Sequence, residues 1–444
     1  MPRRTLWVIF GVVVVSVACY ERADHNRYGR WFAEALETVD RQYLEAVDDQ
    51  KLFEGAVEGM VRRLDDYSAF LPASETRQLE ELLDQQYGGI GIEVNLEGPE
   101  KQLTITNPLA GTPAYKVGLL SGDKIMAVDG RSTQNLPLKE IVGLLRGRPG
   151  QAVALRVVRT GHDAPLDFQL VRAVIHVDSV YGYRRMPDGS WDFLLPGHER
   201  IGYVRINTFG EATVNEVAAA LKWLKERQCR GLILDMRNNP GGLLQAAEAI
   251  CDMFVPEGAV IVSIRGRDGR ERNPFLGTGR GAYQQLPLVV LVNGKSASAS
   301  EIVAGCLQDH ERATVVGERT WGKGTVQNVI PLEGGKSRIK LTTATYWRPS
   351  GKNIHRSSTS QETDSWGVRP NPDCEVVLDD KQTVKWLEGL RNRDLRSTSA
   401  GKPTPADQGP DAAAAPPFDP QLERAVEVLE QKLSPAPPLK SDAA

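Results

Sequence analysis

The 444-residue sequence predicts a multi-domain α/β protein. Residues 176–395 repeat a strand–helix rhythm, in which RGLILD precedes LLQAAEAICDMF and PLVVLVN precedes SEIVAGCLQDH. That alternation is typical of a sheet flanked by helices. A chain of this length has room for about two or three domains, and 41% hydrophobic with 25% charged residues is an ordinary globular composition.

The first 24 residues predict a signal peptide or a membrane anchor. Arg3 and Arg4 precede an apolar run, residues 6–20, which is shorter than the roughly 20 residues of a full membrane span. Three outcomes are open: cleavage after export, retention as an anchor, or lipidation at Cys19. Each of them places the folded part outside the cytoplasm, in the periplasm or the cell envelope.

Residues 25–86 predict a mostly helical region. Apolar residues recur there at helical spacing, and RQLEELLDQQ continues the pattern. We expect at least a packed helical cap. The apolar positions are Trp31, Phe32, Leu36, Val39 and Tyr43.

Residues 87–175 alternate short β-rich runs with turns and include two helical segments, a pattern that resembles a PDZ domain. The segment opens with Gly88-Gly89-Ile90-Gly91, which by itself is also compatible with a simple strand-entry turn. A PDZ domain adds a peptide tail to its sheet edge and binds the terminal carboxylate on backbone N–H groups. The resemblance implies these peptide-binding residues, with the helical ones accepting an apolar tail side chain: Gly89, Ile90, Gly91, Ile92, Leu138, Ile141 and Val142.

The C-terminal part divides into a linker and a helix. Residues 396–418 are rich in Ala, Pro and polar residues, which predicts a flexible linker. Residues 419–434 contain DPQLERAVEVLEQKL, which predicts a short amphipathic helix.

Charge and cysteine content exclude several classes of function. A formal charge of −3 gives no basis for binding nucleic acid or an anionic membrane surface. The five cysteines form no CxxC pair, and the six histidines form no HExxH pattern. We therefore predict no metal site, and no other sequence feature calls for an organic cofactor.

A serine and a lysine in residues 293–327 form a candidate nucleophile and base. Ser298 needs a base beside it, and Lys323 can serve only if its pKa falls from about 10.4 through burial or a nearby positive charge. Lys323 lies between two glycines, which allow close backbone approach. If the strand-like GTVQNVIPL starts near Lys323, then Gln327 lies on the same face and can orient the lysine by a hydrogen bond.

Two alternatives apply to this stretch. Ser298 and Glu301 have capping-box spacing, so Ser298 is also a helix cap, and a helix N-terminus can stabilise an oxyanion. Ser296 and Ser300 remain competing nucleophiles. The residues GERTWGK match the start of a P-loop, but Gly324 replaces the required Ser or Thr, which disfavours nucleotide binding.

A second glycine loop lies upstream, in RGLILDMRNNPGGLLQAAEAI. Its residues predict a strand, a turn and a helix. The simplest interpretation is an ordinary connection between the two elements. The functional interpretation places the N–H of Gly241 or Gly242 at an oxyanion donor position.

Taken together, these segments resemble the carboxyl-terminal processing peptidases, or tail-specific proteases. The resemblance covers most of the chain except the N-terminal apolar run and the stretch near 396–418. It rests on these segments: GMVRRLDDYSAFL, YGGIGIEV, DMRNNPGG, SASASEI, VVGERTWGKGTVQ, TTATYWRPSGKNIHR, WGVRPNPD and DPQLERAVEVL. Trp321 departs from the Tyr or Phe expected before GKG.

The resemblance implies specific roles. Ser298 would be the nucleophile, Lys323 the base and Gln327 its orienting partner. The N–H groups of Ala299 and Gly241 would form the oxyanion hole, with Gly242 as the alternative one residue further on. Arg172 aligns with an arginine that couples PDZ occupancy to protease alignment in relatives. The core would be a crotonase-like β-superhelix with an inserted PDZ domain.

The predicted function is that of an exported serine endopeptidase with a Ser–Lys dyad. Its PDZ domain would recognise polypeptides with accessible C-terminal tails, and its core would cleave them near the C-terminus. The terminal helices would provide contacts for a homo-oligomer or a lid. The alternatives are a non-catalytic PDZ adaptor of the cell envelope and a crotonase-like acyl-CoA enzyme; the intact Ser298, Lys323 and Gln327 argue against the first.

Overall fold

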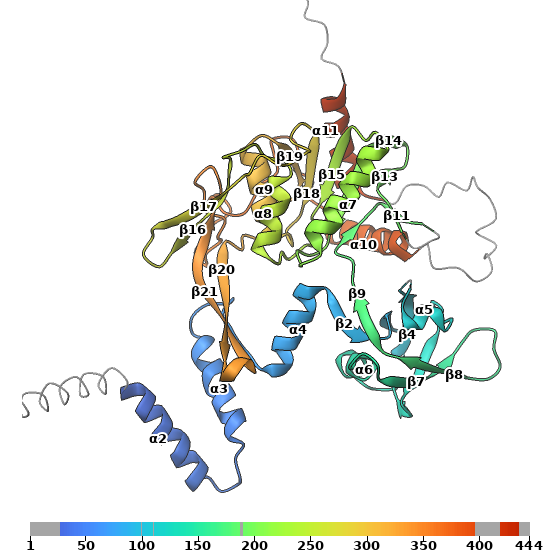
Figure 1. The fold of residues 1–444 in the computed structure, drawn as a ribbon, viewed down its shortest axis with the longest axis vertical. Helices are drawn as coiled ribbons and strands as arrows, with labels where there is room; N and C mark the ends of the chain where they lie inside the picture. The colour runs from blue at the N-terminus through green and yellow to red at the C-terminus, as the bar shows by residue number, and fades with distance from the viewer. Residues whose placement is uncertain (1–26, 99, 110, 187–189, 396–417, 435–444) are drawn as a thin grey trace, which may run out of the picture. The chain divides into compact units, whose positions relative to one another are not determined.

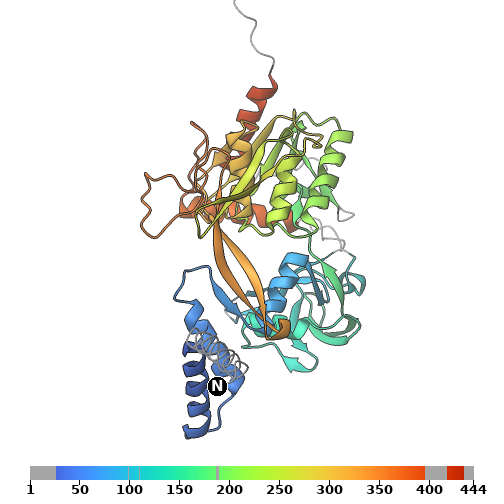
Figure 2. The same ribbon diagram turned by 60° about the vertical axis from the view of Figure 1, so that its left-hand side comes forward.

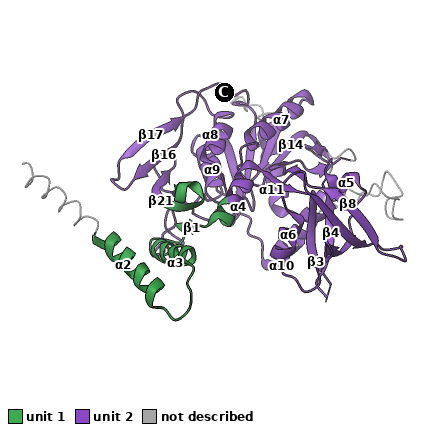
Figure 3. Cartoon of the chain, turned by 60° about the horizontal axis from the view of Figure 1, so that its bottom comes forward, with its two compact units in different colours: residues 1–76, 327–342 green, residues 77–326, 343–444 purple. Residues whose placement is uncertain are grey.

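The computed structural model describes residues 27–98, 100–109, 111–186, 190–395 and 418–434. The expected leader and nearly all of the expected linker lie outside these residues. The chain divides into two compact units, which are described separately (Figure 3). Unit 1 comprises residues 1–76 and 327–342, and unit 2 comprises residues 77–326 and 343–444.

Unit 1 combines N-terminal helices with part of a β-ribbon from late in the chain. Its helices are α2 (Arg27–Gln42) and α3 (Asp49–Val61), followed by β1 (Ala69–Leu71) and the start of α4 (Ala73–Asp84). The ribbon consists of β20 (Thr325–Leu332) and β21 (Ser337–Trp347), which pair with each other (Figure 2). A short 3₁₀ turn, η1 (Glu333–Gly335), joins them.

Strand pairing and a small apolar cluster hold unit 1 together. β1 runs antiparallel to β21, with Ala69 opposite Lys340. Val57, Val61 and Phe70 are buried at this junction. By contrast, α2 buries none of its residues, and Tyr28 and Trp31 are exposed. The predicted helix therefore forms, but its apolar face is not part of a packed cap.

Unit 2 contains a small antiparallel domain at the predicted PDZ position. Its sheet has the order β3-β4-β5-β7-β8, with β6 paired to β5. A separate two-stranded pair, β2 with β9, lies at its entry and exit. The bounds are β2 (Gln86–Gly89), β3 (Ile92–Glu97), β4 (Gln102–Pro108), α5 (Pro113–Lys116), β5 (Lys124–Val128), β6 (Arg131–Ser132), α6 (Leu138–Leu145), β7 (Ala152–Val158), β8 (Leu166–Val171) and β9 (Ala173–His176).

The larger domain of unit 2 is built on four parallel strands, in the order β14-β15-β18-β19 (Figure 1). These strands are β14 (His198–Ile206), β15 (Gly231–Asp235), β18 (Leu288–Val292) and β19 (Ala313–Gly317). β10 (Val180–Tyr181) and β13 (Leu194–Leu195) add antiparallel edges along β14. The strand–helix rhythm of the sequence thus gives a mixed α/β fold, as predicted.

Helices cover both faces of this sheet. Successive side chains of a strand point to opposite faces, so β15 contacts helices on each side. Leu232 and Leu234 of β15 pack in one cluster with α7 (Thr213–Glu226), α8 (Leu244–Asp252) and α9 (Ala299–Asp309). Ile233 packs on the opposite face against α11 (Pro420–Leu433). Every residue of β15 is buried, as expected for a parallel strand covered on both sides.

The remaining strands and one helix complete unit 2. β16 (Val260–Gly266) pairs with β17 (Glu271–Leu276) and with the unit 2 end of β21. β11 (Arg184–Arg185) and β12 (Trp191–Asp192) form a small ribbon, and α10 (Asp380–Leu395) follows the core. Within the described ranges, none of the helices has the length and apolar character needed to span a bilayer.

A buried ion network fastens α11 to the end of β15. The Arg237 guanidinium donates to Asp235 Oδ2 at 2.6 Å and to Asp419 Oδ1 at 2.7 Å. Tyr203 Oη also donates to Asp235 Oδ2, at 2.7 Å. Arg237 is 2% exposed and lies four residues before Gly241, so this network also anchors the glycine loop.

Replacing Arg237 by Leu should destabilise the fold by about 3–5 kcal/mol, because it leaves two buried carboxylates without their counter-charge. The free energy of unfolding from a denaturant titration measures this. Arg230→Leu is the matched control: this arginine is exposed beside the same strand, and its loss should change stability by less than about 1 kcal/mol. Equal effects for the two variants would contradict the assigned role of the network.

Candidate active site

Ser298 lies where the chain leaves β18 and enters α9. It is the N-cap residue of α9, with φ 56° and ψ −115°. A non-glycine residue rarely adopts a positive φ, and such strained positions cluster at functional sites. The side chain is 8% exposed, so it lies at the edge of the core.

The two competing serines have structural partners. Ser296 Oγ donates to the Met236 carbonyl oxygen at 2.8 Å and accepts from the Asn293 N–H at 2.9 Å. Ser300 Oγ donates to the Asn239 carbonyl oxygen at 3.0 Å. Both residues are fully buried. Their hydroxyl groups therefore hold the loop in place, and both residues are more deeply buried than Ser298.

The glycine loop packs directly against the serine loop. Gly241 has φ 99°, and a Cβ atom there would lie 2.7 Å from Ser298 Cβ and 3.0 Å from Ala299 N. The Ala297 N–H donates to the Asn239 carbonyl oxygen at 3.0 Å, which ties the two loops together. Only glycine fits at position 241. The predicted oxyanion residues Gly241 and Ala299 are thus brought together.

The Gly241 N–H has a hydrogen-bond partner that no sequence pattern predicts. It donates to Asn239 Oδ1 at 2.8 Å, while Asn239 Nδ2 donates to the Ile206 carbonyl oxygen at 2.7 Å. Ala299 opens α9, where the first N–H groups of a helix lack intrahelical acceptors. The role of Gly241 as an oxyanion donor stays a prediction, and it requires the N–H to leave Asn239.

A buried carboxylate joins the predicted nucleophile, Ser298, to the predicted base, Lys323. Glu301 Oε2 accepts from the main-chain N–H of Ser298 and from that of Lys323, each at 2.8 Å. Its other oxygen accepts from the Thr320 hydroxyl at 2.6 Å and from the Gly322 N–H at 2.7 Å. From the sequence alone, Glu301 is recognisable only as the second member of a capping box. The S-x-x-E spacing was the available signal, but it did not reveal the link to the lysine loop.

Burial raises the pKa of Glu301 from its ordinary value of 4.5 to about 7, although four hydrogen bonds oppose the rise. Such a shift corresponds to about 3 kcal/mol against the charged form. Burial of the ionised carboxylate at this cost lowers the stability of the folded state. Its hydrogen bonds connect the main chain at Ser298 to the main chain at Lys323.

Lys323 is half-buried in the loop between β19 and β20, two residues before β20 begins. Gly322 has φ 89°, and a Cβ atom on Gly324 would lie 2.1 Å from the main-chain nitrogen of His355. The flanking glycines therefore permit the close backbone approach that the sequence suggested. Trp321, which precedes them, is 54% exposed.

Gln327 belongs to unit 1, whereas Ser298 and Lys323 belong to unit 2. Within unit 1, Gln327 Nε2 donates to the hydroxyl oxygen of Thr342 on β21 at 3.2 Å. The predicted role of Gln327 as the partner of Lys323 stays a prediction.

The predicted peptide-binding residues occupy two kinds of position in the PDZ region. Ile90 and Ile141 are 2% and 0% exposed and belong to the domain core. Leu138 and Val142, on α6, are half-buried and more accessible than Ile141. Ile141 therefore packs α6 against the core of the PDZ region and is not accessible to a peptide in this structure. Gly89 and Gly91 are buried and Ile92 is half-buried.

Arg172 is buried inside the PDZ region. Its guanidinium donates to three main-chain carbonyl oxygens: Leu144 at 2.7 Å, Ala152 at 2.9 Å and Leu145 at 3.2 Å. Two of these belong to the last turn of α6, so Arg172 caps the C-terminus of the helix that borders the expected peptide groove. Its predicted coupling role stays a prediction.

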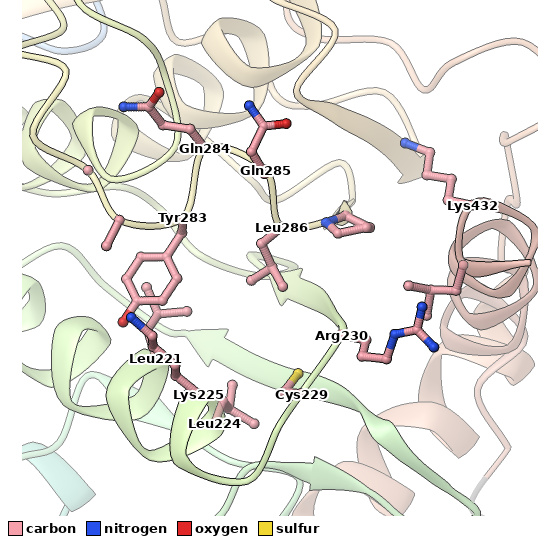
Figure 4. Close-up of a pocket in the computed structure, with 14 residues that line it drawn as sticks. Leu221, Leu224, Lys225, Cys229, Arg230, Tyr283, Gln284, Gln285, Leu286 and Lys432 are labelled. Carbon is pink, nitrogen blue, oxygen red and sulfur yellow. The ribbon is translucent and has the colours of Figure 1, made fainter. Parts of the chain in front are cut away.

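Two cavities in the described part of unit 2 are lined by none of the predicted site residues. One, of about 710 Å³, is bordered by Leu221, Cys229, Tyr283, Arg230 and Lys432 (Figure 4). The other, of about 460 Å³, is bordered by Tyr87, Asn107 and Tyr181 among others. Among the described residues, no group of three or more His, Cys, Asp or Glu side chains is arranged to hold a metal ion.

Glu301→Gln should lower kcat by about tenfold or more, because an amide NH₂ would then face N–H donors. In the wild type, the ionised carboxylate forms as pH rises through about 7 and accepts from all four donors, so activity should rise there. Stability should change in the opposite direction. The raised pKa favours the folded state fully below about pH 4.5, and this advantage is lost as pH rises to about 7.

Both effects are measured by profiles of kcat and of unfolding free energy between pH 4 and 9. In Glu301→Gln, neither kcat nor the unfolding free energy should show the change near pH 7 that the Glu301 carboxyl group causes. The control is Glu311→Gln, an exposed residue just beyond the same helix. Unchanged profiles in Glu301→Gln would contradict the prediction.

Comparison with known proteins identifies three matching segments. Residues 200–371 match the family described as peptidase family S41, residues 104–159 match a PDZ domain, and residues 21–76 match the activating protease CtpB N-terminal domain. The larger domain, the small antiparallel domain and the N-terminal helices each contain one of these matches.

Two relatives matched by sequence agree with this assignment. A carboxy-terminal-processing protease of Bartonella bacilliformis is 35% identical over 98% of this chain and 97% of its own length. The carboxy-terminal processing protease CtpB of Bacillus subtilis is 36% identical over 72% of this chain and 64% of its own. The solved photosystem II D1 C-terminal processing protease has 30% identity over 78% of this chain and 92% of its own, with a TM-score of 0.43. The resemblance seen in the sequence is confirmed: the chain belongs to the carboxy-terminal processing serine proteases of peptidase family S41.

Proposed function

We propose that this protease cleaves polypeptides near their C-terminus with Ser298 as nucleophile and Lys323 as general base. The observation that carries the proposal is the carboxylate of Glu301, which accepts from the main-chain N–H groups of both residues at 2.8 Å. A shared buried acceptor fixes the backbone of nucleophile and base relative to each other. Such positioning is what acyl transfer by a weak hydroxyl nucleophile requires.

The chemistry would proceed by acyl transfer. Ser298 Oγ attacks the scissile carbonyl carbon while neutral Lys323 accepts the hydroxyl proton. The N–H groups of Ala299 and Gly241 stabilise the oxyanion. Lys323 then gives its proton to the leaving amine, and a water molecule, deprotonated by the same lysine, hydrolyses the acyl-enzyme. Gln327, four residues after Lys323, orients the amine, and no metal or organic cofactor takes part.

The fold-level part of the proposal is a crotonase-like superhelical core. The parallel sheet β14-β15-β18-β19 with helices on both faces is compatible with it. The acyl-CoA enzymes of related folds are the alternative, and the PDZ domain together with the Ser298 and Lys323 pair disfavours them.

Tail recognition is assigned to the PDZ domain. The loop Gly88–Gly91 would bind the terminal carboxylate, and half-buried Leu138 and Val142 would contact an apolar tail residue. Arg172 secures the end of α6 through three carbonyl oxygens, so it links this groove to the chain that returns to the core. A bound tail would then change how the PDZ domain and the core align.

Location and assembly complete the proposal. The apolar run of residues 6–20 supports export, with residence in the periplasm or at the membrane. The exposed aromatic residues of α2, Tyr28 and Trp31, support association between copies through the N-terminal helices. The alternative function is a non-catalytic PDZ adaptor, which would bind tails without turnover.

Ser298→Ala and Lys323→Ala should each abolish cleavage of a fluorogenic peptide, and Lys323→Arg should fail as well because arginine does not release its proton. Thermal unfolding should remain close to that of the wild type. Ser296→Ala and Ser300→Ala serve as matched controls, since they should lower stability through lost hydrogen bonds more than they lower reactivity. Turnover that survives in Ser298→Ala and disappears in Ser296→Ala would refute the assignment. Tail binding by the wild type without any cleavage would favour the adaptor.

Arg172→Ala should weaken binding of a labelled tail peptide by about tenfold, because three carbonyl oxygens at the end of α6 lose their donor. Cleavage of long substrates should fall in parallel, while a small serine-reactive probe should still label Ser298. Fluorescence anisotropy and probe labelling measure the two effects. Arg148→Ala, a nearby exposed position, is the control. Unchanged tail affinity and cleavage in Arg172→Ala would show that this arginine has no such role.

A further inference from the structure

We propose that the cavity of about 710 Å³ in unit 2 is a binding site for a small amphiphilic anion of the fatty-acid class (Figure 4). The inference goes beyond the proposed function, because none of the predicted site residues lines this cavity. Its volume lies within the range of about 300–1,000 Å³ that small-molecule sites occupy.

The cavity lies at the opposite end of the parallel sheet from the candidate active site. Its residues come from α7, the turn that follows α7, the chain before β18 and the end of α11. β15 begins directly after the lining residue Arg230, and β18 begins directly after the lining residue Pro287. The glycine and serine loops follow the C-terminal ends of these two strands. The cavity and the candidate active site are therefore separate.

The inner surface of the cavity is largely apolar. Leu221 and Leu224 of α7 are buried, and Tyr283 and Leu286 are partly buried. All four pack in the hydrophobic core that α7 shares with the sheet. A hydrocarbon chain placed against these side chains would be removed from water, which favours its binding.

The charged side chains that line the cavity are all cationic. Of its 14 lining residues, Lys225, Arg230 and Lys432 carry a positive charge, and none is an Asp or a Glu. Within the described ranges, no ion pair joins any of these three to a carboxylate. A set of cations without counter-charges attracts an anion.

Arg312 adds to the positive charge beside the cavity. Its guanidinium donates to the carbonyl oxygens of Leu286 at 2.9 Å and of Tyr283 at 3.2 Å, so it holds the chain that forms one wall. Burial and then the nearby Arg312 guanidinium lower the pKa of Lys432. A bound anion would offset the repulsion between these two cations.

The helix ends explain only part of this charge pattern. Lys225 and Lys432 lie in the last turns of α7 and α11, where a cation also complements the helix dipole. Arg230 belongs to neither helix, so the dipoles do not account for its place at the cavity.

The surroundings favour a hydrocarbon chain over an extended peptide. A peptide that binds by strand addition needs an unpaired sheet edge. None of the lining residues lies on a strand, and β15 and β18, which begin beside the cavity, each have a paired strand on both sides. The cavity therefore offers apolar side chains and cations but no strand edge.

The arrangement of the side chains gives the ligand a direction. Figure 4 shows Arg230 and Lys432 on one side of the cavity and Leu221 and Tyr283 on the other, with Leu286 between them. The anionic head would lie beside Arg230 and Lys432. The chain would pass Leu286 towards Leu221 and Tyr283.

The test is an isothermal titration of the full chain with dodecanoate, below the concentration at which it forms micelles. We expect one molecule to bind per chain. Arg230→Gln and Lys432→Gln should each raise Kd by about fivefold, because a solvent-accessible ion pair is lost. Lys222→Gln is the matched control: this lysine is exposed on α7 but does not line the cavity, so Kd should not change.

Cys229 reports where the ligand binds. Its thiol is free and partly buried at the cavity, whereas the other described cysteines are buried. Dodecanoate should slow the labelling of Cys229 by a maleimide, measured by mass spectrometry of the labelled peptide. Ala282→Trp places an indole at an exposed lining position and should abolish dodecanoate binding.

Two further ligands define the chemical class. Acetate has the anionic head without the chain, and dodecyltrimethylammonium has the same chain with the opposite charge. Neither should bind in the concentration range in which dodecanoate does. Equal binding of dodecyltrimethylammonium would show that the cations have no part, and equal binding of acetate would show that the chain has none.

Either of those results overturns the proposal, as does the absence of dodecanoate binding. Unchanged labelling of Cys229, or unchanged affinity in Ala282→Trp, would place dodecanoate elsewhere on the chain and would also overturn it. Thermal unfolding identifies any variant that fails to fold. In that case the protection of Cys229 in the wild type decides the outcome.

Discussion

The arrangement of the candidate site depends on the Glu301 carboxylate. Its two oxygens accept from four donors, which lie at the start of α9 and in residues 320–323. Because these segments share one acceptor group, the backbones of Ser298 and Lys323 cannot shift independently without breaking a buried hydrogen bond. The raised pKa of Glu301, about 7, reflects the cost of burying this charge. The fold therefore holds a destabilising group where it links the predicted nucleophile to the predicted base.

A second set of contacts, made by the loop after β15, holds the serine loop in place. The main-chain oxygen of Asn239 accepts from the Ala297 N–H and from Ser300 Oγ, each at 3.0 Å, and Arg237 holds the same loop to α11. The parallel strands β15 and β18 end beside each other, which places the glycine loop next to the serine loop. Ligands of open α/β sheets bind at such strand ends. The site thus follows from the order of the strands as much as from its own side chains.

Sequence patterns could predict the elements but not all of their partners. The strand–helix rhythm predicts the α/β fold, and the glycines around Lys323 predict a close backbone approach, because both depend on local spacing. The partners of Gly241 and Arg172 depend on tertiary contacts, so no local pattern indicated Asn239 or the carbonyl oxygens at the end of α6. Likewise, the helical spacing of α2 predicted a helix but did not tell whether its apolar face is covered, and in this structure it is exposed.

The predicted oxyanion role of the Gly241 N–H has to be weighed against its hydrogen bond in this structure. It donates to Asn239 Oδ1 at 2.8 Å, and Asn239 Nδ2 donates to the Ile206 carbonyl oxygen, so the acceptor is well fixed. Exchange of this acceptor for an oxyanion gives up a neutral hydrogen bond worth about 0.5–1.5 kcal/mol. An oxyanion donor contributes about 2.7–4 kcal/mol in the transition state. Since the second quantity exceeds the first, the hydrogen bond to Asn239 orders the loop in this structure and is still compatible with the predicted oxyanion role of the Gly241 N–H.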